Sequence, residues 1–345
     1  MYGDTYLLHI AEGYRWERLE EVGAPPSPRW RHTATLLPDN DIIFVFGGLC
    51  RGKRYNDAHL FSIRERKWRR AQIAGTPPHP RSHHTANLVE FDEGSDGHAE
   101  KKVFIIGGYG ESEHTMRPLP SADSNSTTRT HTGGHGSACD FSMDVHALDL
   151  DSWSWSRIER IRGPPPRPRA DHTVSVAGKL LLLAGGRGTA TRGFSGHFED
   201  VHVLDLVAQE WKTPSGYRDG EGSSVRWPLL PSTLWNHVAM TVASTDSHKL
   251  FVFGGQNAEF SYSNAVHVLD VRRMVWSSPH ISGATPPPRE DCGFGYEACE
   301  CSLLVFGGWA EGWLDDLWAL NVARAIGPPY TVSALKPSRG RITGG

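Results

Sequence analysis

Three side chains of types that ligate zinc are spaced four residues apart in one segment of the sequence. They are His131, His135 and Cys139 in "HTGGHGSACD", and Asp140 follows directly. These are ligand types that zinc takes in proteins, but structural zinc sites usually also contain a closely spaced cysteine pair. The segment has no preceding CxxC pair and is rich in serine, threonine and glycine. We therefore interpret it as a loop and predict no metal site and no cofactor.

Arginine and histidine recur at a fixed spacing along the chain. An Arg-x-x-His step opens "PRWRHTATLL", "PRSHHTANLV" and "PRADHTVSV", whereas "TLWNHVAMTV" keeps only the histidine and "REDCGFGY" keeps only the arginine. The four arginines are Arg29, Arg81, Arg169 and Arg289. Because the histidines recur once per copy, we interpret them as structural hydrogen-bonding residues. The sequence contains no nucleophile elbow, HExxH motif or phosphate-binding glycine loop, so no catalytic residue is predicted.

Each copy continues into an apolar run that ends in two glycines. The runs are "IIFVFGG", "VFIIGG", "LLLAGG", "LFVFGG" and "LLVFGG". A short continuous apolar run is typical of a strand that is buried on both faces. The glycines predict a turn with positive φ beside a bulky neighbour, such as the tryptophan of the same repeat. They are therefore interpreted as structural residues.

A strand of alternating character follows each pair of glycines, as in "NDAHLFSI" and "EDVHVLDL". In four copies a tryptophan lies nine residues after the histidine of this strand, as Trp68 does after His59, but the last copy lacks it. Proline-rich links such as "GAPPSPR" lead to the next copy, and proline cannot lie inside a central strand. Each copy is therefore predicted to contain four strands.

Such units resemble kelch repeats. The resemblance implies an all-β fold, a kelch-type β-propeller of four-stranded antiparallel sheets around a channel. Five blades are nearly whole and the N-terminus supplies only two strands, so we predict six blades with the first incomplete. The alternative is five blades, with the N-terminal "YRWERLE" strand completing the last one. The propeller is assigned to residues 1–326. Residues 327–345, with "YTVSALKPSRGRITGG", resemble the start of an immunoglobulin-like IPT/TIG domain after a linker.

Composition limits the classes of partner. The net charge of −3 gives no excess of Lys and Arg, so we predict neither a nucleic-acid partner nor binding to a membrane surface. Apolar stretches such as "KLLLLAG" are far shorter than the roughly 20 residues of a membrane span. The N-terminus shows no secretory signal, and five scattered cysteines favour a reducing compartment. We therefore expect a cytoplasmic protein, with cytoskeletal association as one setting.

The long insertions fall on one predicted face of the ring. Residues 109–141 and 187–198 follow second strands and 215–233 follow a fourth strand, and all of these connections open on the same side. Insertions in repeat proteins commonly gather on the binding face, where arginine beside exposed aromatic residues is typical of protein-binding hot spots. The candidate contacts are Arg29, Arg81, Arg169, Arg289, Tyr109, Arg187, Phe194, Phe260, Trp309 and Trp313. For the four repeat arginines, bonding to backbone carbonyls around the channel is the alternative.

The kelch resemblance implies two classes of function. The first is a non-enzymatic protein-interaction or scaffold module within a larger adaptor or structural protein, which forms part of a multi-protein assembly. The alternative is an enzyme similar to the copper radical oxidases, but the copper-ligand tyrosines and histidines of that family cannot be placed on this sequence. We therefore predict a protein partner and no enzymatic activity.

Overall fold

The computed structural model describes residues 3–20, 22–93, 99–111, 139–189, 195–212, 229–243, 247–323 and 331–335. Within these ranges the regular structure consists of β-strands and one three-residue 3-10 helix, η1 (Pro38–Asn40). No helix in the described part of the chain is long and apolar enough to cross a membrane. The predicted all-β class is confirmed.

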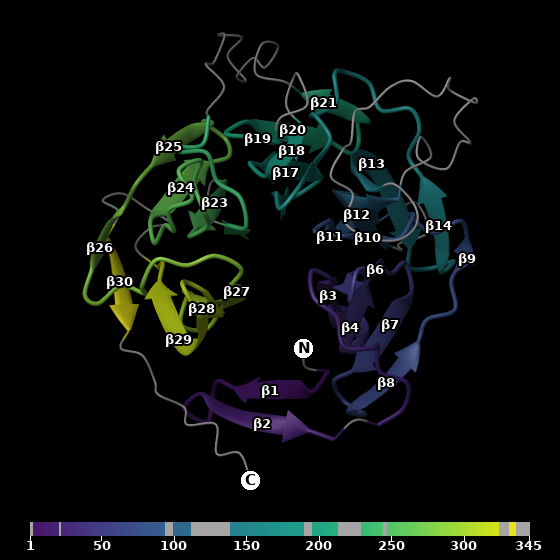
Figure 1. The fold of residues 1–345 in the computed structure, drawn as a ribbon, viewed down its shortest axis with the longest axis horizontal. Coiled ribbons are helices and arrows are strands. Elements are labelled where there is room, and N and C mark those ends of the chain that lie inside the picture. The colour runs from purple at the N-terminus through teal and green to yellow at the C-terminus, as the bar shows by residue number, and fades with distance from the viewer. Residues whose placement is uncertain are drawn as a thin grey trace, which may run out of the picture.

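Five sheets share one up-and-down order of strands and are arranged as a ring (Figure 1). Blade 1 contains β3 (Thr33–Leu37), β4 (Ile42–Phe46), β7 (Ala58–Ser62) and β8 (Lys67–Arg70). Blade 2 contains β11 (Thr85–Glu93), β12 (Ala99–Glu111), β13 (Cys139–Asp149) and β14 (Ser154–Arg157). Blade 3 contains β16 (Thr173–Ala177), β17 (Leu180–Ala184), β20 (Val201–Asp205) and β21 (Glu210–Lys212). Blade 4 contains β22 (Val238–Ala243), β23 (His248–Phe253), β24 (Val266–Asp270) and β25 (Val275–Ser277). Blade 5 contains β27 (Gly293–Glu297), β28 (Ser302–Trp309), β29 (Trp313–Asn321) and β30 (Thr331–Leu335).

Shorter strands extend the blades at their ends. β10 (Arg81–Ser82) pairs with β12, and β15 (Arg169–Ala170) pairs with β18 (Arg187–Thr189), which also pairs with β19 (Ser195–His197). β5 (Leu49–Cys50) and β6 (Lys53–Arg54) form a small hairpin beyond blade 1. β9 (Ala74–Gly75) and β26 (His280–Ser282) run parallel to the fourth strand of the following blade. These parallel pairs join blade 1 to blade 2 and blade 4 to blade 5.

The N-terminus forms a two-stranded sheet, the terminal hairpin, from β1 (Thr5–His9) and β2 (Arg15–Leu19). It lies between blade 5 and blade 1 (Figure 1). The ring of Trp16 contacts Phe306 of blade 5 with centroids 4.7 Å apart, and Leu19 packs in one cluster with Val45 of blade 1. Because β2 pairs with β1 and not with β29, the pairing that the five-bladed alternative requires is not formed. The number of blades in the ring stays a prediction.

The fourth strand of blade 5 lies later in the sequence than expected. β30 pairs antiparallel with β29 and places Ala334 opposite Leu320. Ala334 thus occupies the position that tryptophan has in blade 2, where Trp155 lies opposite Leu148. The predicted boundary at residue 326 therefore does not coincide with the end of the propeller sheet, because the edge of β29 takes this β-branched segment as its partner. Residues 336–345 lie outside the described ranges, and the IPT/TIG-like domain stays a prediction.

Side chains of each second strand alternate between the two neighbouring blades. Leu250 and Val252 of β23 pack in one apolar cluster with blade 3, whereas Phe251 and Phe253 pack in another with blade 5. This period of two follows from the pleat of a strand that is covered on both faces. The core therefore consists of apolar layers between adjacent blades, as the continuous apolar runs predict.

The paired glycines permit contact between blades. Gly47 and Gly48 have φ of 66° and 99°, and the other four pairs also have positive φ. A Cβ on Gly47 would lie 2.9 Å from the carbonyl oxygen of Arg81 in blade 2, and the N–H of Gly48 donates to the same oxygen. The predicted positive φ is confirmed, but the crowding neighbours of Gly47 are the imidazole of His84 and the carbonyl of Arg81, both in the next blade. The expectation that the neighbour would be the tryptophan of the same repeat was wrong.

The four repeat arginines are buried inside their blades. Arg169, which has no exposed surface, donates to the carbonyl of Gly185 at 2.9 Å and forms two hydrogen bonds with the carboxylate of Asp200 at 2.5 and 2.9 Å. Arg29, Arg81 and Arg289 make the same contacts with Asp57, Asp144 and Asp316. The alternative of carbonyl bonding is confirmed. Their prediction as partner contacts was wrong, because the guanidinium groups are fully used within the blade.

Blade 4 replaces both members of this ion pair. Leu234 stands at the arginine position and is buried, and Ala265 stands at the aspartate position, two residues before His267. Removing one partner of a buried ion pair leaves an uncompensated charge, whereas replacing both with apolar residues is often neutral. The joint replacement in blade 4 follows this rule.

We expect Arg169→Leu to lower the unfolding free energy by about 3–5 kcal/mol, because Asp200 is left without its guanidinium. The double variant R169L/D200A, which reproduces the pair found in blade 4, should recover most of this loss. Thermal unfolding followed by circular dichroism would rank the wild type and the double variant above the single variant.

The matched control is the exposed pair of Glu12 and Arg15, which form a surface ion pair. E12A/R15L should change stability by less than about 1 kcal/mol. A double variant R169L/D200A no more stable than R169L would contradict the pairing argument.

Candidate functional site

One equivalent backbone pairing in each blade lies on the same face of the ring as the glycine pairs. The residue after each repeat arginine, or after Leu234 in blade 4, pairs with the residue that follows the glycines. The pairs are Trp30 with Leu49, Ser82 with Tyr109, Ala170 with Arg187, Trp235 with Gln256, and Glu290 with Trp309. The predicted contacts Tyr109, Arg187 and Trp309 therefore occupy one equivalent position. We call this side of the ring the loop face.

The described ends of the insertions also lie on the loop face. Glu111 and Cys139, which flank one insertion, extend the sheet beyond Tyr109, and Arg187 lies opposite His197 at the base of another. The insertion residues 112–138, 190–194 and 213–228 lie outside the described ranges, and so does the predicted contact Phe194.

In each blade, one residue with a left-handed backbone lines a cavity in the middle of the ring. Arg31, His83, Asp171, Asn236 and Asp291 have φ between 54° and 59°, and each lies directly before the histidine position of its repeat. Backbone hydrogen bonds of 3.1 to 3.3 Å join them in order, from the N–H of each residue to the carbonyl of its predecessor in the preceding blade. We call these five residues the central cluster.

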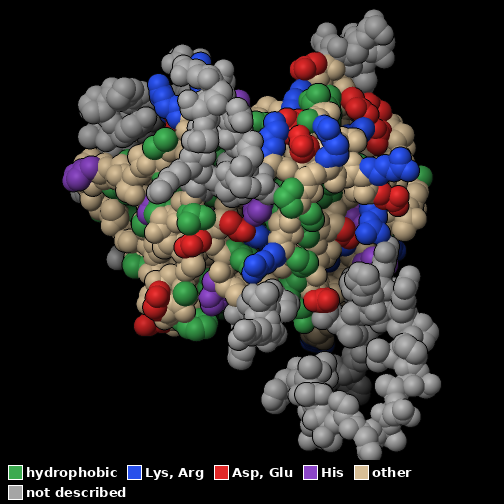
Figure 2. All heavy atoms as spheres, turned by 90° about the horizontal axis from the view of Figure 1, so that it is seen from above, with side chains coloured by type: hydrophobic (Ala, Val, Ile, Leu, Met, Phe, Trp, Pro, Cys, Tyr) green, Lys and Arg blue, Asp and Glu red, His purple; other side chains and the backbone are tan. Residues whose placement is uncertain are grey.

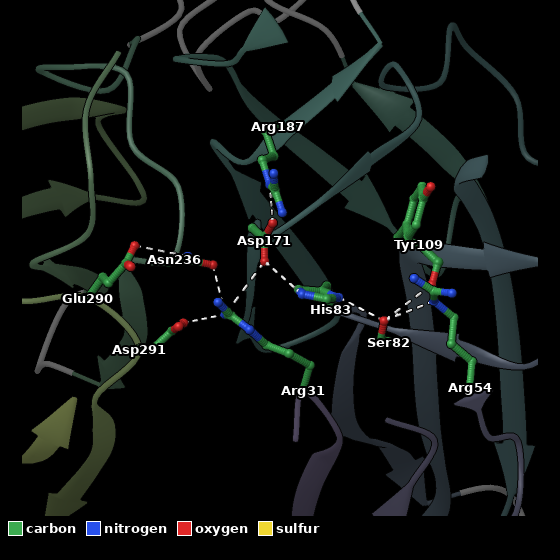
Figure 3. A network of polar contacts seen from close by, with 10 residues as sticks. All are labelled: Arg31, Arg54, Ser82, His83, Tyr109, Asp171, Arg187, Asn236, Glu290 and Asp291. Atoms are coloured by element: carbon green, nitrogen blue, oxygen red, sulfur yellow. Dashed lines mark hydrogen bonds and ion pairs between the residues drawn. The ribbon is translucent and has the colours of Figure 1, made fainter. Parts of the chain in front are cut away.

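Arg31 connects the side chains of the central cluster across the ring (Figure 3). Its guanidinium donates to Asn236 Oδ1 at 2.7 Å and to the carboxylate of Asp291, and it lies 3.5 Å from Asp171. Asn236 in turn donates to Glu290 at 2.9 Å. One cation from blade 1 therefore joins acidic and amide groups of blades 3, 4 and 5.

Asp171 is the anionic centre of the network. Its side chain has no exposed surface, and Arg187 Nε donates to it at 2.5 Å. Burial raises the pKa of Asp171, but His83, Arg31 and Arg187 lower it by more, so the net shift is downward. Burial lowers the pKa of His83 to about 4, which leaves this imidazole neutral at pH 7. Asp171 is therefore held as a carboxylate by the two arginines.

Asp291 differs from Asp171 in its electrostatic surroundings. Burial raises the pKa of Asp291 to about 7, with Glu290 and Asp171 acting in the same direction and Arg31 opposing them. Asp171 and Asp291 both lie beside the guanidinium of Arg31, and Glu290 adds a further negative charge near Asp291, so a proton on Asp291 reduces the repulsion among them.

Ser82, His83 and Asp171 are the residue types of a serine hydrolase triad. The Ser82 hydroxyl lies 2.8 Å from His83 Nδ1, but it is fully buried and also donates to the carbonyl of Tyr109. His83 Nε2 lies 3.8 Å from Asp171, beyond hydrogen-bond distance. With a pKa of about 4, His83 is a weak base. The three groups are therefore not arranged for nucleophilic catalysis.

The central cluster lines a cavity of about 430 Å³ whose wall also includes Trp30 and Trp313. Within the described ranges, no group of histidine, cysteine, aspartate or glutamate is arranged to hold a metal ion. Figure 2 shows basic and acidic side chains interspersed on the side of the ring that it draws.

Exposed aromatic residues lie on the loop face, and one of them, Trp313, also lines the cavity. Trp313 is 78% exposed and its ring contacts Trp309, while Phe260 is 65% exposed and contacts Trp235 edge-on. The guanidinium of Arg187 lies over the ring of Trp235, 5.0 Å from its centroid. The predicted contacts Phe260, Trp309, Trp313 and Arg187 thus lie on supported aromatic surfaces.

Sequence reasoning missed the central cluster. The position before each histidine carries a different residue type in almost every copy, so it looks variable. A signal was nevertheless present, because all five copies have a polar or charged residue there.

The ring of four-stranded sheets, its glycine pairs and its buried arginines define the chain as a kelch-type β-propeller. The sequence model of the KLHDC2/KLHL20/DRC7 Kelch-repeats domain matches residues 1–226 and 228–341, so the chain belongs to this family. The solved structure of YjhT has the same fold, with a TM-score of 0.63 and 18% identity over 97% of this chain and 91% of that one.

Relatives of this chain are mostly much longer proteins. The flagellar outer arm dynein alpha chain of Chlamydomonas reinhardtii is 34% identical over 99% of this chain and 7% of its own length. Human host cell factor 1 is 24% identical over 88% of this chain and 13% of its own length. Kelch domain-containing protein 3 of Rattus norvegicus is 25% identical over 81% of this chain and 65% of its own length.

Asp291 should make stability depend on pH. Its folded pKa of about 7 lies above the value of about 3.9 for a free aspartate. The unfolded chain releases this proton first, so stability falls as pH rises from about 4 to 7 and is constant above that range. We expect the wild type to lose up to about 1.4 kcal/mol per pH unit relative to Asp291→Asn across this window.

Thermal midpoints of the wild type and D291N between pH 5 and 8 would measure this difference. Asp315→Asn removes an exposed carboxylate of the same chemistry and should give one constant difference from the wild type over this range. A constant difference for D291N as well would contradict the assignment.

Proposed function

We propose that the chain is a non-enzymatic protein-interaction module whose loop face docks a protein partner. The observation that carries this proposal is the exposure of Trp313 and Phe260 on one face, where Arg187 lies over the ring of Trp235 that Phe260 contacts. Tryptophan and arginine dominate the binding energy of protein interfaces, and rigid aromatic anchors cost little entropy when they bind. The burial of Ser82 and the weak basicity of His83 favour binding over catalysis.

The proposed setting is a cytoskeleton-associated assembly in the cytoplasm. The relative with 34% identity is a dynein alpha chain of the flagellar outer arm, and host cell factor 1 shares the same repeats. This chain spans only 7% and 13% of the lengths of these two relatives. We therefore infer a scaffold or adaptor role within a larger assembly.

The variant W313A/F260A tests the loop face. Each side chain is an exposed aromatic anchor, so we expect their joint loss to weaken capture of loop-face partners by at least about 10-fold, equivalent to 1.4 kcal/mol. The immobilised chain would be incubated with an extract of flagellated cells, and the captured proteins would be quantified by mass spectrometry and titrated individually.

The matched control is V207A/V275A, which removes exposed apolar side chains from the hairpins between the third and fourth strands of blades 3 and 4, at the ends opposite the loop face. This variant should retain the partners. Equal loss in both variants, or retention in both, would count against the loop face as the docking surface.

The metal content of the purified chain tests the enzymatic alternative. The proposal expects copper and iron well below one equivalent in elemental analysis. A stoichiometric amount of either metal that persists after dialysis would favour an oxidase instead.

A further inference from the structure

The outer strand of blade 1 and the turn before it carry a dense cluster of basic residues. Five of the seven residues from 64 to 70 are arginine or lysine, and all five are exposed. They are Arg64, Arg66, Lys67, Arg69 and Arg70, and we call them the basic edge. The fourth strands of the other blades carry at most one basic residue each. This concentration of positive charge stands out in a chain whose net charge is −3.

Most cations of the basic edge have no carboxylate partner within the described part of the chain. Arg66 lies 2.6 Å from Glu17 of the terminal hairpin, much as the exposed Arg15 lies 2.7 Å from Glu12. The other four members of the basic edge form no ion pair with any described residue. Their charges are therefore available to an anion from outside these ranges.

The backbone beneath the basic edge is held from both sides. Trp68, in the middle of β8, donates its N–H to the carbonyl of Val22 at 2.8 Å and accepts a hydrogen bond from the N–H of Ala24 at 3.0 Å. On the other side β8 pairs with β7, and the indole of Trp68 donates to Thr5 at 3.2 Å. The basic side chains thus extend from a fixed strand, so that a partner has to order only their rotamers.

Basic side chains lie on both faces of β8. Lys67 and Arg69 point to one face of the sheet, and Trp68 and Arg70 point to the other. Arg69 lies opposite Leu60, which packs in the cluster shared with blade 2, whereas Trp68 packs in the cluster shared with the terminal hairpin. In Figure 1, β8 forms the outer side of blade 1. Positive charge therefore flanks this outer strand on both sides.

The basic edge is unfavourable for the stability of the free chain. Lys67 and Arg69 are neighbours on one face, about 7 Å apart along the strand. This separation is shorter than the Debye length of about 8 Å at physiological ionic strength, so the two charges repel each other. Local arrangements that cost stability are expected at functional sites. Binding of an anion would relieve the repulsion.

We propose that the basic edge is a docking site for a short acidic segment of a partner protein. The segment lies along β8 in extended form, so that successive Asp or Glu side chains, which alternate in direction, reach the cations on both faces. The guanidinium groups can each bind a carboxylate through two hydrogen bonds. This interface contains none of the loop-face residues, so it is a second docking surface of the same chain.

Other polyanions fit the basic edge less well. Single-stranded nucleic acids are bound through aromatic side chains on which bases stack, but Trp68 is buried. A DNA duplex would extend beyond this short strand over a chain of net negative charge. Stable membrane binding needs a second signal besides a polybasic patch, and residues 64–70 expose no apolar side chain. A short acidic peptide segment meets none of these difficulties.

A fluorescein-labelled octaglutamate peptide tests the site by anisotropy titration against the full chain. We expect saturable binding that weakens as the NaCl concentration rises from about 50 to about 300 mM. The variant K67Q/R69Q/R70Q should weaken binding by at least about 10-fold, which three exposed ion pairs can supply together.

The matched control R160Q/R162Q/R167Q removes the same number of charges from exposed positions in the link between blades 2 and 3. This control and the loop-face variant W313A/F260A should both bind the peptide nearly as the wild type does. Failure of this proposal is therefore distinguishable from failure of the proposed function.

Thermal unfolding separates a role in binding from a role in folding. Because K67Q/R69Q/R70Q relieves repulsion, its unfolding midpoint should equal or exceed that of the wild type. A lower midpoint would show that these residues support the blade, and it would overturn the proposal.

Three binding results would also overturn it. The first is absence of octaglutamate binding, and the second is equal loss of binding in the two triple-glutamine variants. The third is tighter binding of an oligothymidine DNA or of phosphatidylserine vesicles that K67Q/R69Q/R70Q abolishes, since the occupant would then be a nucleic acid or a membrane.

Discussion

The buried ion pair between the repeat arginine and its aspartate joins three points of each blade that are distant in sequence. In blade 3 it ties Arg169 at the start of the first strand to Gly185 after the second and to Asp200 before the third. Burial raises the pKa of Asp200, but hydrogen bonds from Arg169 and His202 lower it by more, so the carboxylate is ionised at neutral pH. The pair fixes the loop-face ends of the three inner strands, on which the glycine turn and the aromatic ladder depend.

The contact between blades depends on backbone conformation more than on side-chain chemistry. A Cβ on Gly47, Gly185 or Gly254 would collide with a carbonyl oxygen of the next blade, and the N–H of the glycine that follows each of them donates to that same oxygen. The central cluster places non-glycine residues in left-handed conformations, which cost about 1–2 kcal/mol each. The inter-blade hydrogen bonds offset this strain. Because the backbone fixes each position, the side chains there are free to differ, and Arg31, Asp171 and Asp291 could acquire complementary charges.

Much of the fold could be predicted from the sequence because its spacings report directly on strand register. The interval from His59 to Trp68 reflects the antiparallel pairing of third and fourth strands, and the apolar runs reflect burial on both faces. The fourth strand of blade 5 escaped prediction because it has no tryptophan and follows a longer connection. The site was predicted only in part. Aromatic residues such as Trp313 are easily recognised in a sequence, whereas the convergence of Arg31, Asp171 and Asp291 depends on how the blades are arranged around the cavity.

Departures from the repeat are as informative as the repeat itself. Blade 4 loses arginine and aspartate together, so its charge balance is kept and Leu234 is buried. The terminal hairpin keeps Asp4, and within the described residues no repeat arginine binds it. A buried or half-buried carboxylate without its cation is costly unless something compensates it. The same physical rule therefore explains why blade 4 needs no ion pair, and it singles out Asp4 of the terminal hairpin, whose carboxylate lies 3.8 Å from the exposed Arg18.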